Sequence, residues 1–340
     1  MAGVSVCVTG ASGKTVNKEE TYRLNNEQSD KKTGHLKRLE KAAENLRLFN
    51  ADLLDYDAMA AATAGCQGVF HVATPVPSDD LTDPEASYYL QMLGPAVTGT
   101  TNVLKAATAA NVRRVVVVSS IVAVEVNPKD WPEGKIRDEN CWSDREFCRN
   151  IKSWYPVAKI ISEEAAIQYG RQTGLDVVTV NPGLVFGPLL QPTTIALCTV
   201  HLIRASCVLF GTDTGGPDQV RDKLWHIVDV RDVADALLLV YESPQASGRH
   251  ICAPHVISVR ELLDLLKSKY PAYRCISKEA IYDMDHPAPM TSEKLKKLGW
   301  SCRTLEETIE DTVQFCRDAK FLEDANGAPP CRFPPLFNMI

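Results

Sequence analysis

The sequence predicts an α/β fold in which helices cover both faces of a parallel β-sheet. Short, uninterrupted apolar runs alternate along the chain with helical segments, and a strand buried on both faces gives such a run. When a helix connects two successive strands, it carries the chain back to the edge where the first strand began, so the two strands lie parallel. A glycine-rich turn directly follows the first strand-like run. The 340 residues, 45% hydrophobic and 24% charged, suffice for a large core.

The elements of the first half follow in order. The first run, Val4–Val8, is apolar and ends at the glycine turn. Alanine predominates at 58–64, which favours a helix, and the four valines at 115–118 favour a buried strand. Strands are expected at 4–8, at 46–49 leading to 51–53, at 69–73, 114–119 and 176–181, and helices at 58–64, 98–110 and 156–171.

The second half is less regular. After Gly187, loops with prolines interrupt the pattern, which returns as a strand at 226–228, a helix at 230–241 and a strand at 250–252. Thr304 with Glu307 three residues later forms a capping-box pattern, which predicts a last helix ending near Asp318. We therefore expect a smaller, more irregular lobe over the carboxyl edge of the sheet, where substrates of such folds bind.

The turn Thr9-Gly10-Ala11-Ser12-Gly13 is typical of half a dinucleotide-binding fingerprint. Glycine lets the backbone approach a pyrophosphate, and a helix that begins there points its N–H groups at the negative charge. The third small residue of the fingerprint is replaced by the bulkier Val16. Gly13-Lys14-Thr15 also imitates the end of a nucleoside-triphosphate loop, but that motif needs a glycine where the chain has Val8.

Tyr155 and Lys159 form the candidate catalytic pair. On a helix, residues four apart share one face, so the Lys159 ammonium can lie beside the Tyr155 phenol and favour its ionised form. A free tyrosine has a pKa of about 10, and bringing it close to neutrality requires roughly 3 to 4 kcal/mol. One close, partly desolvated lysine supplies much of this, which makes Tyr155 a candidate acid.

The composition argues against several functions. The formal net charge of −6 argues against nucleic acid or an anionic membrane as the main partner. The apolar run 195–210 contains His201 and Arg204 and is too short and polar to span a bilayer. Met1 leads straight into a strand, which leaves no room for a signal peptide. The eleven cysteines show no metal-ligand spacing, so we expect a cytoplasmic protein with reduced thiols and no metal site.

The glycine turn, Ser119-Ser120 and Tyr155 with Lys159 follow one another in that order along the chain. Together they resemble the motifs of the extended short-chain dehydrogenase/reductases of the epimerase/dehydratase superfamily. The resemblance covers nearly the whole chain. Within the superfamily, Cys141-Trp142-Ser143-Asp144 and Ala73-Thr74-Pro75 are similar to plant cinnamoyl-CoA reductases and dihydroflavonol reductases. The matching motifs are the glycine turn, Ser119-Ser120, Tyr155 with Lys159, Asp52-Leu53, His71-Val72-Ala73-Thr74-Pro75, Asn181-Pro182-Gly183 and Asp229-Val230-Arg231-Asp232-Val233.

The resemblance implies a Rossmann-type, doubly wound parallel sheet with a smaller C-terminal substrate-binding lobe. The dinucleotide-binding domain is expected at 1–187 and the lobe at 188–340, with segments near 226–254 returning to the first domain. It also implies NADP(H) as cofactor and an aromatic carbonyl or acyl-CoA as small-molecule substrate. We expect a monomer or a weak homodimer.

The same resemblance implies a hydride transfer from the nicotinamide C4 to a carbonyl carbon. Tyr155 would donate the proton, Ser120 would polarise the carbonyl, and Lys159 would hold the ribose hydroxyls while lowering the tyrosine pKa. Ser119 is the alternative to Ser120 for polarising the carbonyl. Otherwise Ser119 is a strand-end residue whose hydroxyl bonds to the backbone. Asn102 resembles the asparagine that orders the catalytic helix and its water, although a lone Asn can equally cap or pack.

Cofactor contacts are implied along the carboxyl edge of the sheet. Asp52 and Leu53 would flank the adenine, and Pro182, Gly183 and Val185 would border the nicotinamide. The full implied set is Gly10, Ser12, Gly13, Lys32, Asp52, Leu53, Ala73, Thr74, Ser119, Tyr155, Lys159, Pro182, Gly183 and Val185.

Other polar and aromatic residues carry plainer expectations. His226 and Trp142 are candidates for lining the substrate pocket. His71, inside a strand, is expected to be a satisfied core histidine. Glu163 and Glu164 are expected on the solvated face of the Tyr155 helix.

The interval 14–30 departs from the family. It contains only Val16, Tyr22 and Leu24 as sizeable apolar groups and is too short for both a first helix and a second strand. The strand-end arginine that would contact the 2′-phosphate of NADPH is therefore absent. Lys31, Lys32 and Arg38 remain as candidate phosphate contacts, and no strand-end carboxylate selects NAD.

Two further departures concern the substrate. At 194–215, where the cinnamoyl-CoA and dihydroflavonol reductases have a polar helical segment that helps shape the substrate pocket, this chain has an apolar sequence that begins Ile195-Ala196-Leu197-Cys198. The catalytic helix reads Ser153-Trp154-Tyr155-Pro156-Val157-Ala158-Lys159, where cinnamoyl-CoA reductases carry Asn-Trp-Tyr-Cys-Tyr-Gly-Lys.

Three interpretations of the function stay open. The chain is an NADPH-dependent reductase, a catalytically silent protein of the same fold whose cofactor site was lost with 14–30, or a sugar-nucleotide epimerase or dehydratase. Cys141-Trp142-Ser143-Asp144 favours the reductase.

Overall fold

A computed structural model of the chain describes residues 4–10, 33–73, 93–128, 135–189, 220–271, 278–283 and 288–318. The strands are β1 Val6–Thr9, β2 Gly68–His71, β3 Arg114–Val118, β4 Asp176–Pro182, β5 Leu184–Phe186, β6 Val220–Arg221, β7 Leu224–Asp229, β8 Gly248–Cys252, β9 His255–Ser258 and β10 Ile281–Tyr282. The helices are α2 Ala42–Asn45, α3 Tyr56–Thr63, α5 Gly94–Ala109, α6 Val122–Glu125, α7 Arg145–Asn150, α8 Trp154–Thr173, α10 Val230–Glu242, α11 Val259–Lys269, α12 Glu293–Lys297 and α13 Leu305–Asp318, with a 3₁₀ turn at Lys278–Ala280.

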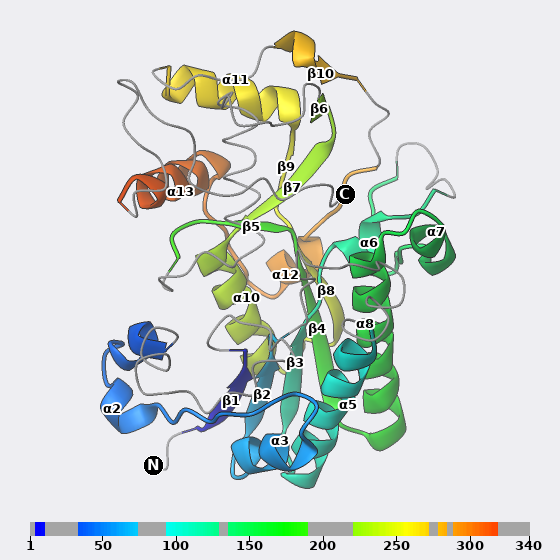
Figure 1. The fold of residues 1–340 in the computed structure, drawn as a ribbon, viewed down its shortest axis with the longest axis vertical. Helices are drawn as coiled ribbons and strands as arrows, with labels where there is room; N and C mark the ends of the chain where they lie inside the picture. The colour runs from blue at the N-terminus through cyan, green and yellow to red at the C-terminus, as the bar shows by residue number, and fades with distance from the viewer. Residues whose placement is uncertain are drawn as a thin grey trace, which may run out of the picture.

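Five parallel strands form the central sheet, in the order β1-β2-β3-β4-β8 (Figure 1). Strand β8 pairs with β4, so a late segment of the chain completes a sheet begun at the N-terminus. The other strands, with α11 and α13, form a second group in the upper half of the figure. This arrangement confirms the predicted α/β fold with a parallel sheet.

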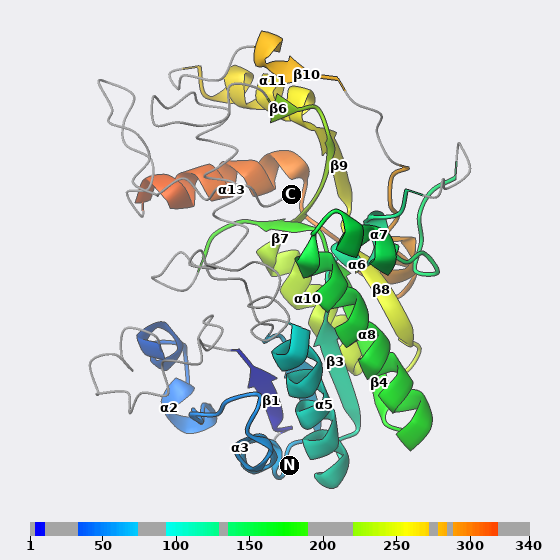
Figure 2. The ribbon, with the colours of Figure 1, turned by 45° about the vertical axis from the view of Figure 1, so that its right-hand side comes forward.

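Helices lie on both faces of the sheet (Figure 2). Val115 and Val117 of β3 pack in one cluster with side chains of α5 and with Ala166 of α8. Val116, between them, packs on the opposite side with Val233 and other residues of α10. Successive strand residues point to opposite faces, so a strand covered twice needs apolar residues at every position. This explains the run of valines seen in the sequence.

The long helices extend a few residues beyond the expected ranges. Helix α5 begins at Gly94, with Pro95 in its first turn, where the missing N–H costs no hydrogen bond. Helix α8 carries both Tyr155 and Lys159 and ends at Thr173, and the capping residue that follows, Gly174, has a left-handed φ of 78°. Glycine adopts this conformation without strain, so it terminates the helix there.

The expected strand at 46–49 is wrong. These residues form no strand, and Leu48 and Phe49 are exposed. A strand requires a neighbour for its backbone hydrogen bonds, and β1 is the edge of the sheet among the described residues. The segment predicted to lack a second strand, 14–30, lies outside the described residues.

The second group of strands builds its own core. Strands β5, β7 and β9 form a three-stranded sheet, and buried residues of α11 and α13, such as Leu263 and Ile309, pack on Ile227 of β7. Helix α11 was not expected from the sequence. Its signal was present, because Ser258 and Glu261 form a complete capping box in which each side chain bonds the backbone N–H of the other residue.

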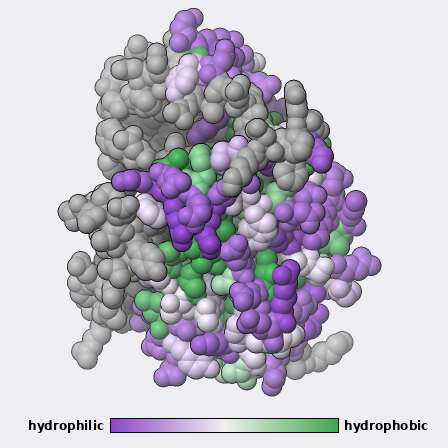
Figure 3. Space-filling view, turned by 90° about the vertical axis from the view of Figure 1, so that its right-hand side faces the viewer, coloured by the Kyte–Doolittle hydropathy of each residue, from purple (hydrophilic) through white to green (hydrophobic). Residues whose placement is uncertain are grey.

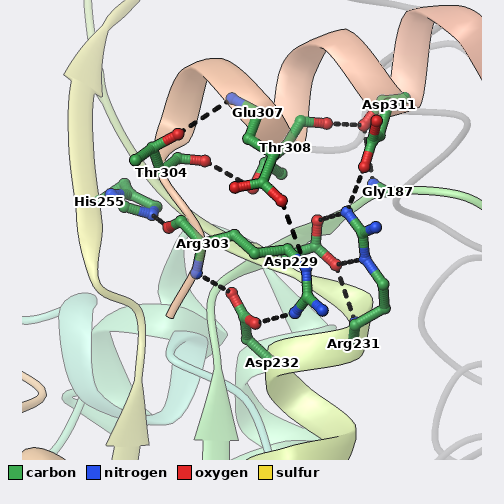
Figure 4. Close-up of polar contacts among 11 residues, drawn as sticks. Gly187, Asp229, Arg231, Asp232, His255, Arg303, Thr304, Glu307, Thr308 and Asp311 are labelled. Carbon is green, nitrogen blue, oxygen red and sulfur yellow. Dashed lines mark hydrogen bonds and ion pairs between the residues drawn. The ribbon is translucent and has the colours of Figure 1, made fainter. Parts of the chain in front are cut away.

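An ionic network fastens α13 to the start of α10 (Figure 4). Asp232 accepts hydrogen bonds from the backbone and the guanidinium of Arg303. Arg231 bonds Asp229 at 2.7 Å and Asp311 of α13 at 2.6 Å. The aspartates of the motif at 229–233 therefore join two helices, and their role in the described structure is to hold the second group of elements against the first.

The surface on the side of α7 and α8 is mostly hydrophilic, with hydrophobic areas near the middle of the view (Figure 3). Charged residues such as Arg145 and Glu164 pair across these two helices while both remain about half exposed. Within the described residues, no helix is long and apolar enough to cross a membrane.

Candidate active site

The carboxyl ends of the parallel strands bring the predicted site residues to one edge of the sheet. Gly10 follows β1, Ala73 follows β2, and Ser119 and Ser120 follow β3, while Pro182 ends β4. In register, Thr9 lies opposite His71 and Val117 opposite both His71 and Thr179. Ligands of open α/β sheets bind outside this edge.

Gly10 and Ala73 bring the first two strand ends into close contact. Gly10 has a left-handed φ of 75°, and a Cβ placed on it would lie 2.9 Å from the Ala73 Cα and 3.0 Å from its nitrogen. The Ala73 N–H donates to the Thr9 hydroxyl at 3.2 Å, which holds the two segments together. Glycine is thus required at position 10 for both conformation and space.

Substituting Gly10 with alanine is expected to push these segments apart and to weaken dinucleotide binding by at least about tenfold. A matched control is Gly174→Ala, since Gly174 has nearly the same φ of 78° but nothing within 4 Å of a Cβ. Both variants pay roughly 1 kcal/mol of backbone strain. Only Gly10→Ala should also lose affinity in a calorimetric titration with NADPH; equal affinities in the two variants would contradict this account.

Tyr155 and Lys159 share one face of α8, as predicted from their spacing. The Lys159 Nζ lies 5.8 Å from the centroid of the Tyr155 ring and donates to the Val118 carbonyl, at the end of β3, at 3.2 Å. Lys159 is only 5% exposed. Burial lowers its pKa to about 8, and the nearby Glu163 carboxylate opposes this shift.

The pKa of Lys159 predicts a pH dependence. Because the ammonium is lost as the pH rises through about 8, kcat/KM should fall in the same range, and Lys159→Arg, which stays charged, should move this fall to higher pH.

The free energy of unfolding should rise, rather than fall, as the pH increases through this range. The unfolded lysine titrates at about 10.4, so the unfolded state binds more protons between pH 8 and 10.4, and stability rises with pH there. Lys159→Met should abolish that rise in thermal melts.

The two serines at the end of β3 differ in their contacts. The Ser119 hydroxyl is buried and donates to the Glu163 carboxylate at 2.7 Å. The Ser120 hydroxyl accepts from the Val122 N–H at the start of α6 at 3.3 Å, which leaves its proton available. The expectation that Ser119 bonds backbone was incomplete, because its hydroxyl binds a carboxylate. Ser120 is therefore the better candidate for contact with a substrate oxygen.

Asn102, Asp52 and Leu53 form one unit beside α5. The Asn102 amide donates to the Leu53 carbonyl at 2.9 Å, and so its observed contact is with this segment rather than with α8. The Leu53 side chain packs over Gly99, where a Cβ would lie 2.9 Å from the Leu53 Cβ. The Asp52 carboxylate accepts from the Leu54 N–H. This geometry assigns Asn102 to positioning the 52–53 segment.

Gly183 and its neighbours join the central sheet to the second group of strands. A Cβ on Gly183 would lie 2.3 Å from the His226 carbonyl oxygen, so only glycine permits this approach. The Pro182 carbonyl accepts from the Ile121 N–H at 3.0 Å, and Val185 lies opposite Val228 in the β5–β7 ladder. These contacts place Pro182 and Gly183 beside the segment that follows Ser120.

The expectation that Glu163 is solvated is wrong. Glu163 is 1% exposed and points into a buried cluster with Ser119, Thr179, Asn181 and Arg249. Its spacing of four from Lys159 was the available signal, since the argument that placed Lys159 beside Tyr155 also places Glu163 on that face. Glu164, the next residue, is indeed half exposed.

Three aromatic and histidine side chains complete the surroundings. His71 is buried between the hydroxyls of Thr9, at 2.9 Å, and Thr100, at 3.1 Å, as a core histidine. His226 is buried with its Nδ1 3.8 Å from a Glu125 carboxylate oxygen. Burial and the charge of Arg137 lower its pKa to about 4. The Trp142 ring lies under the Arg249 guanidinium, whose central carbon is 3.6 Å from the ring centroid.

Several predicted residues cannot be placed. Ser12, Gly13, Lys32 and Thr74 lie outside the described residues, as does the whole 194–215 segment. Among the residues that are described, no group of three or more His, Cys, Asp or Glu side chains could hold a metal ion.

Comparison with known proteins agrees with this arrangement. The model of the NAD-dependent epimerase/dehydratase family matches residues 6–253. Cinnamoyl-CoA reductase 1 of Petunia hybrida is 40% identical over 325 residues, which cover 92% of each protein.

Solved structures show the same fold. Vestitone reductase from alfalfa (Medicago sativa) gives a TM-score of 0.70 at 30% identity, over 86% of this chain and 89% of that one. Yeast methylglyoxal/isovaleraldehyde reductase complexed with NADPH gives a TM-score of 0.65 at 25% identity, over 80% of this chain and 84% of that one. The chain therefore belongs to the NAD-dependent epimerase/dehydratase family, with a Rossmann-type fold.

Proposed function

We propose that the chain is an NADP(H)-dependent oxidoreductase that reduces a carbonyl group, or an acyl-CoA thioester, of an aromatic small molecule. The observation that carries the proposal is the placement of buried Lys159 beside Tyr155 and against the Val118 carbonyl, at the end of β3 and two residues before Ser120. The names of the relatives, a cinnamoyl-CoA reductase and a vestitone reductase, support an aromatic substrate.

The residues at the sheet edge suit a dinucleotide. Gly10, which lacks a Cβ and lies against Ala73, offers the close backbone approach that a pyrophosphate needs. Asp52 and Leu53, held by Asn102, would flank the adenine, and Pro182, Gly183 and Val185 would border the nicotinamide. When bound, NADP(H) supplies a hydride for the carbonyl carbon.

The protein's own groups act on the substrate oxygen. Tyr155 donates its phenolic proton to the oxygen as negative charge develops there, and the Ser120 hydroxyl donates a hydrogen bond to the same atom. Two such hydrogen-bond donors stabilise the transition state more than the bound substrate, because the negative charge on the oxygen is greatest in the transition state. The Lys159 ammonium stabilises the phenolate that remains and would hold the ribose hydroxyls of the bound cofactor. Ser119, bound to Glu163, leaves this role to Ser120.

The division of the chain follows the same logic. We propose that residues 1–187 bind the cofactor and that residues 188–340 mostly hold the substrate, with segments near 226–254 returning to the first domain. The pairing of β8 with β4 supports the return of the later segment. The contact between Gly183 and the His226 carbonyl lies where the two parts meet.

NADPH is expected to bind more tightly than NADH, because Lys31, Lys32 and Arg38 offer positive charge to a 2′-phosphate. Arg38 is exposed and thus accessible. Isothermal titration with both cofactors tests this, with Arg38→Ala expected to weaken NADPH and leave NADH unchanged. Arg317→Ala, on α13, is the control for removing a positive charge elsewhere. Equal affinity of the unmodified chain for both cofactors, or a preference for NADH, would exclude the basic residues as the phosphate site.

A panel of carbonyl compounds then identifies the substrate class. An aromatic aldehyde, an aromatic ketone and a cinnamoyl-CoA thioester should be compared under saturating NADPH, with an aliphatic aldehyde as reference. We expect the aromatic compounds to give the higher kcat/KM. Turnover of the aliphatic aldehyde alone would contradict the aromatic class.

A further inference from the structure

Glu163 lies at the centre of a buried polar cluster that the proposed chemistry does not use. It sits one helical turn after Lys159, and its carboxylate accepts hydrogen bonds from Ser119 at 2.7 Å, Thr179 at 2.6 Å and Asn181 at 2.8 Å. All these donors are buried, as is Glu163 itself. The carboxylate therefore remains fully satisfied without water.

Arg249 of β8 balances the charge of Glu163. Its Nε donates to one carboxylate oxygen at 2.9 Å and its Nη2 approaches the other at 3.4 Å. The guanidinium also donates to the carbonyls of Glu139 and Cys141 and stacks 3.6 Å from the Trp142 ring. Such rigid, bidentate pairing fixes the carboxylate in one orientation.

The cluster connects to both sides of the Ser120 residue. Asn181 donates through the same amide nitrogen to Glu163 and, at 3.1 Å, to the Ser120 carbonyl. Because both partners are acceptors, only the amide nitrogen can face them. Ser119, which precedes Ser120, is held by its hydroxyl. Thus one carboxylate oxygen of Glu163 fixes the backbone before and after the candidate catalytic hydroxyl.

We propose that Glu163, held by Arg249, is a positioning residue that fixes the end of β3 and thereby aims the Ser120 hydroxyl at the substrate oxygen. The inference rests on the proposed reductase function. A buried ion pair stabilises a fold no better than apolar side chains of similar volume, so the gain from this pair lies in the geometry it imposes. The same carboxylate opposes the loss of charge on Lys159.

The groups that face Lys159 come from three sources. Tyr155 and Glu163 lie on its own helix, and His71, at the end of β2, feels its charge. Burial and the Lys159 charge lower the pKa of His71 to about 3, so His71 is neutral above that pH and does not titrate with the lysine. From β3, the Val118 carbonyl accepts a hydrogen bond from the Lys159 Nζ.

Glu163→Gln tests the proposal, because glutamine keeps the volume and removes the charge. We expect kcat to fall about 10- to 100-fold, the size of effect that misplacing a reacting group produces. The alkaline fall of kcat/KM should also move to lower pH, since Lys159 loses a negative neighbour. Glu164→Gln, the same change on the exposed side of the helix, should alter neither. An unchanged kcat and pH profile in Glu163→Gln would overturn the proposal.

The variant can fail to fold, because it leaves Arg249 buried without its anion. The double variant Glu163→Gln/Arg249→Met removes both charges, so that no buried ion is left without its partner. It should fold and show the same loss of kcat as expected for Glu163→Gln. Full activity in the double variant would show that the pair serves stability alone.

A readout without substrate separates this inference from the proposed function. Competitive labelling with acetic anhydride, read by mass spectrometry across a pH series, gives the pKa of Lys159 in the free protein, with exposed Lys105 as internal reference. We expect a lower pKa for Lys159 in Glu163→Gln and no change in Glu164→Gln. If the wild-type chain reduces no carbonyl while Glu163→Gln still lowers the pKa of Lys159, the proposed function is refuted and the coupling between Glu163 and Lys159 is retained. An unshifted Lys159 overturns the coupling.

Discussion

Tyr155→Phe is expected to lower kcat by about 10²- to 10⁴-fold and to leave the dissociation constant of NADPH almost unchanged. The substitution removes the proton donor and almost no volume. Tyr155 is half buried and packs with Ala96 of α5 and Ala158 of α8, contacts that phenylalanine preserves. Steady-state kinetics on an accepted carbonyl substrate, with calorimetric titration of NADPH, measures both quantities.

Tyr169→Phe supplies the matched control on the same helix. The Tyr169 hydroxyl contacts only the Thr108 hydroxyl, at 3.1 Å, among the described hydrogen bonds, far along α8 from Lys159. This variant should retain wild-type turnover. More than half of the wild-type activity in Tyr155→Phe would remove Tyr155 from the proton-donor role.

Replacing residues 14–30 with a helix and strand typical of the family is expected to raise stability by about 5 to 10 kcal/mol, from a few hundred Å² of apolar burial at ~25 cal/mol per Å². Strand β1 is the edge of the described sheet, and Val4, Val6 and Val8 are 64%, 40% and 47% exposed. The replacement should carry a small residue at position 16 and a strand-end arginine. Thermal melts and binding of a hydrophobic dye report the gain.

The unmodified chain should accordingly express poorly, bind the dye and give low specific activity, because exposed edge strands and apolar surface promote association. A replacement of the same composition in scrambled order controls for length and charge and should rescue nothing. A cooperative thermal transition together with micromolar NADPH affinity in the unmodified chain would contradict this expectation.

The elements that the sequence predicted correctly are those whose burial follows from local pattern. The valines of β3 need apolar neighbours on both faces, and Tyr155 with Lys159 needs only helical spacing. The segment 46–49 has the same apolar character as a strand but no partner among the described residues. Propensity alone cannot supply that partner, and so the prediction of a strand failed.

Long-range contacts explain what was missed in the candidate site. Glu163 looks like a surface residue in sequence, but the Arg249 that pairs with it is 86 residues away and reaches it only when β8 joins the sheet. For Asn102 the sequence left open a role in ordering the catalytic helix or in capping and packing, and its hydrogen bond in the structure is with the Leu53 carbonyl, 49 residues away. Single side chains of this kind take their role from the packing of distant elements, which periodicity does not encode.

Hydride is expected to pass from NADPH to a substrate carbonyl carbon while Tyr155 supplies the proton to the oxygen. The most direct measurement uses NADPH deuterated at the transferred position of C4 and locates the label in the product by mass spectrometry and NMR. We expect one deuterium per product molecule, on the former carbonyl carbon, and almost no labelled product from Tyr155→Phe in the same time. Product without deuterium, or conversion of a sugar nucleotide with no net consumption of cofactor, would contradict the account and indicate an epimerase or dehydratase instead.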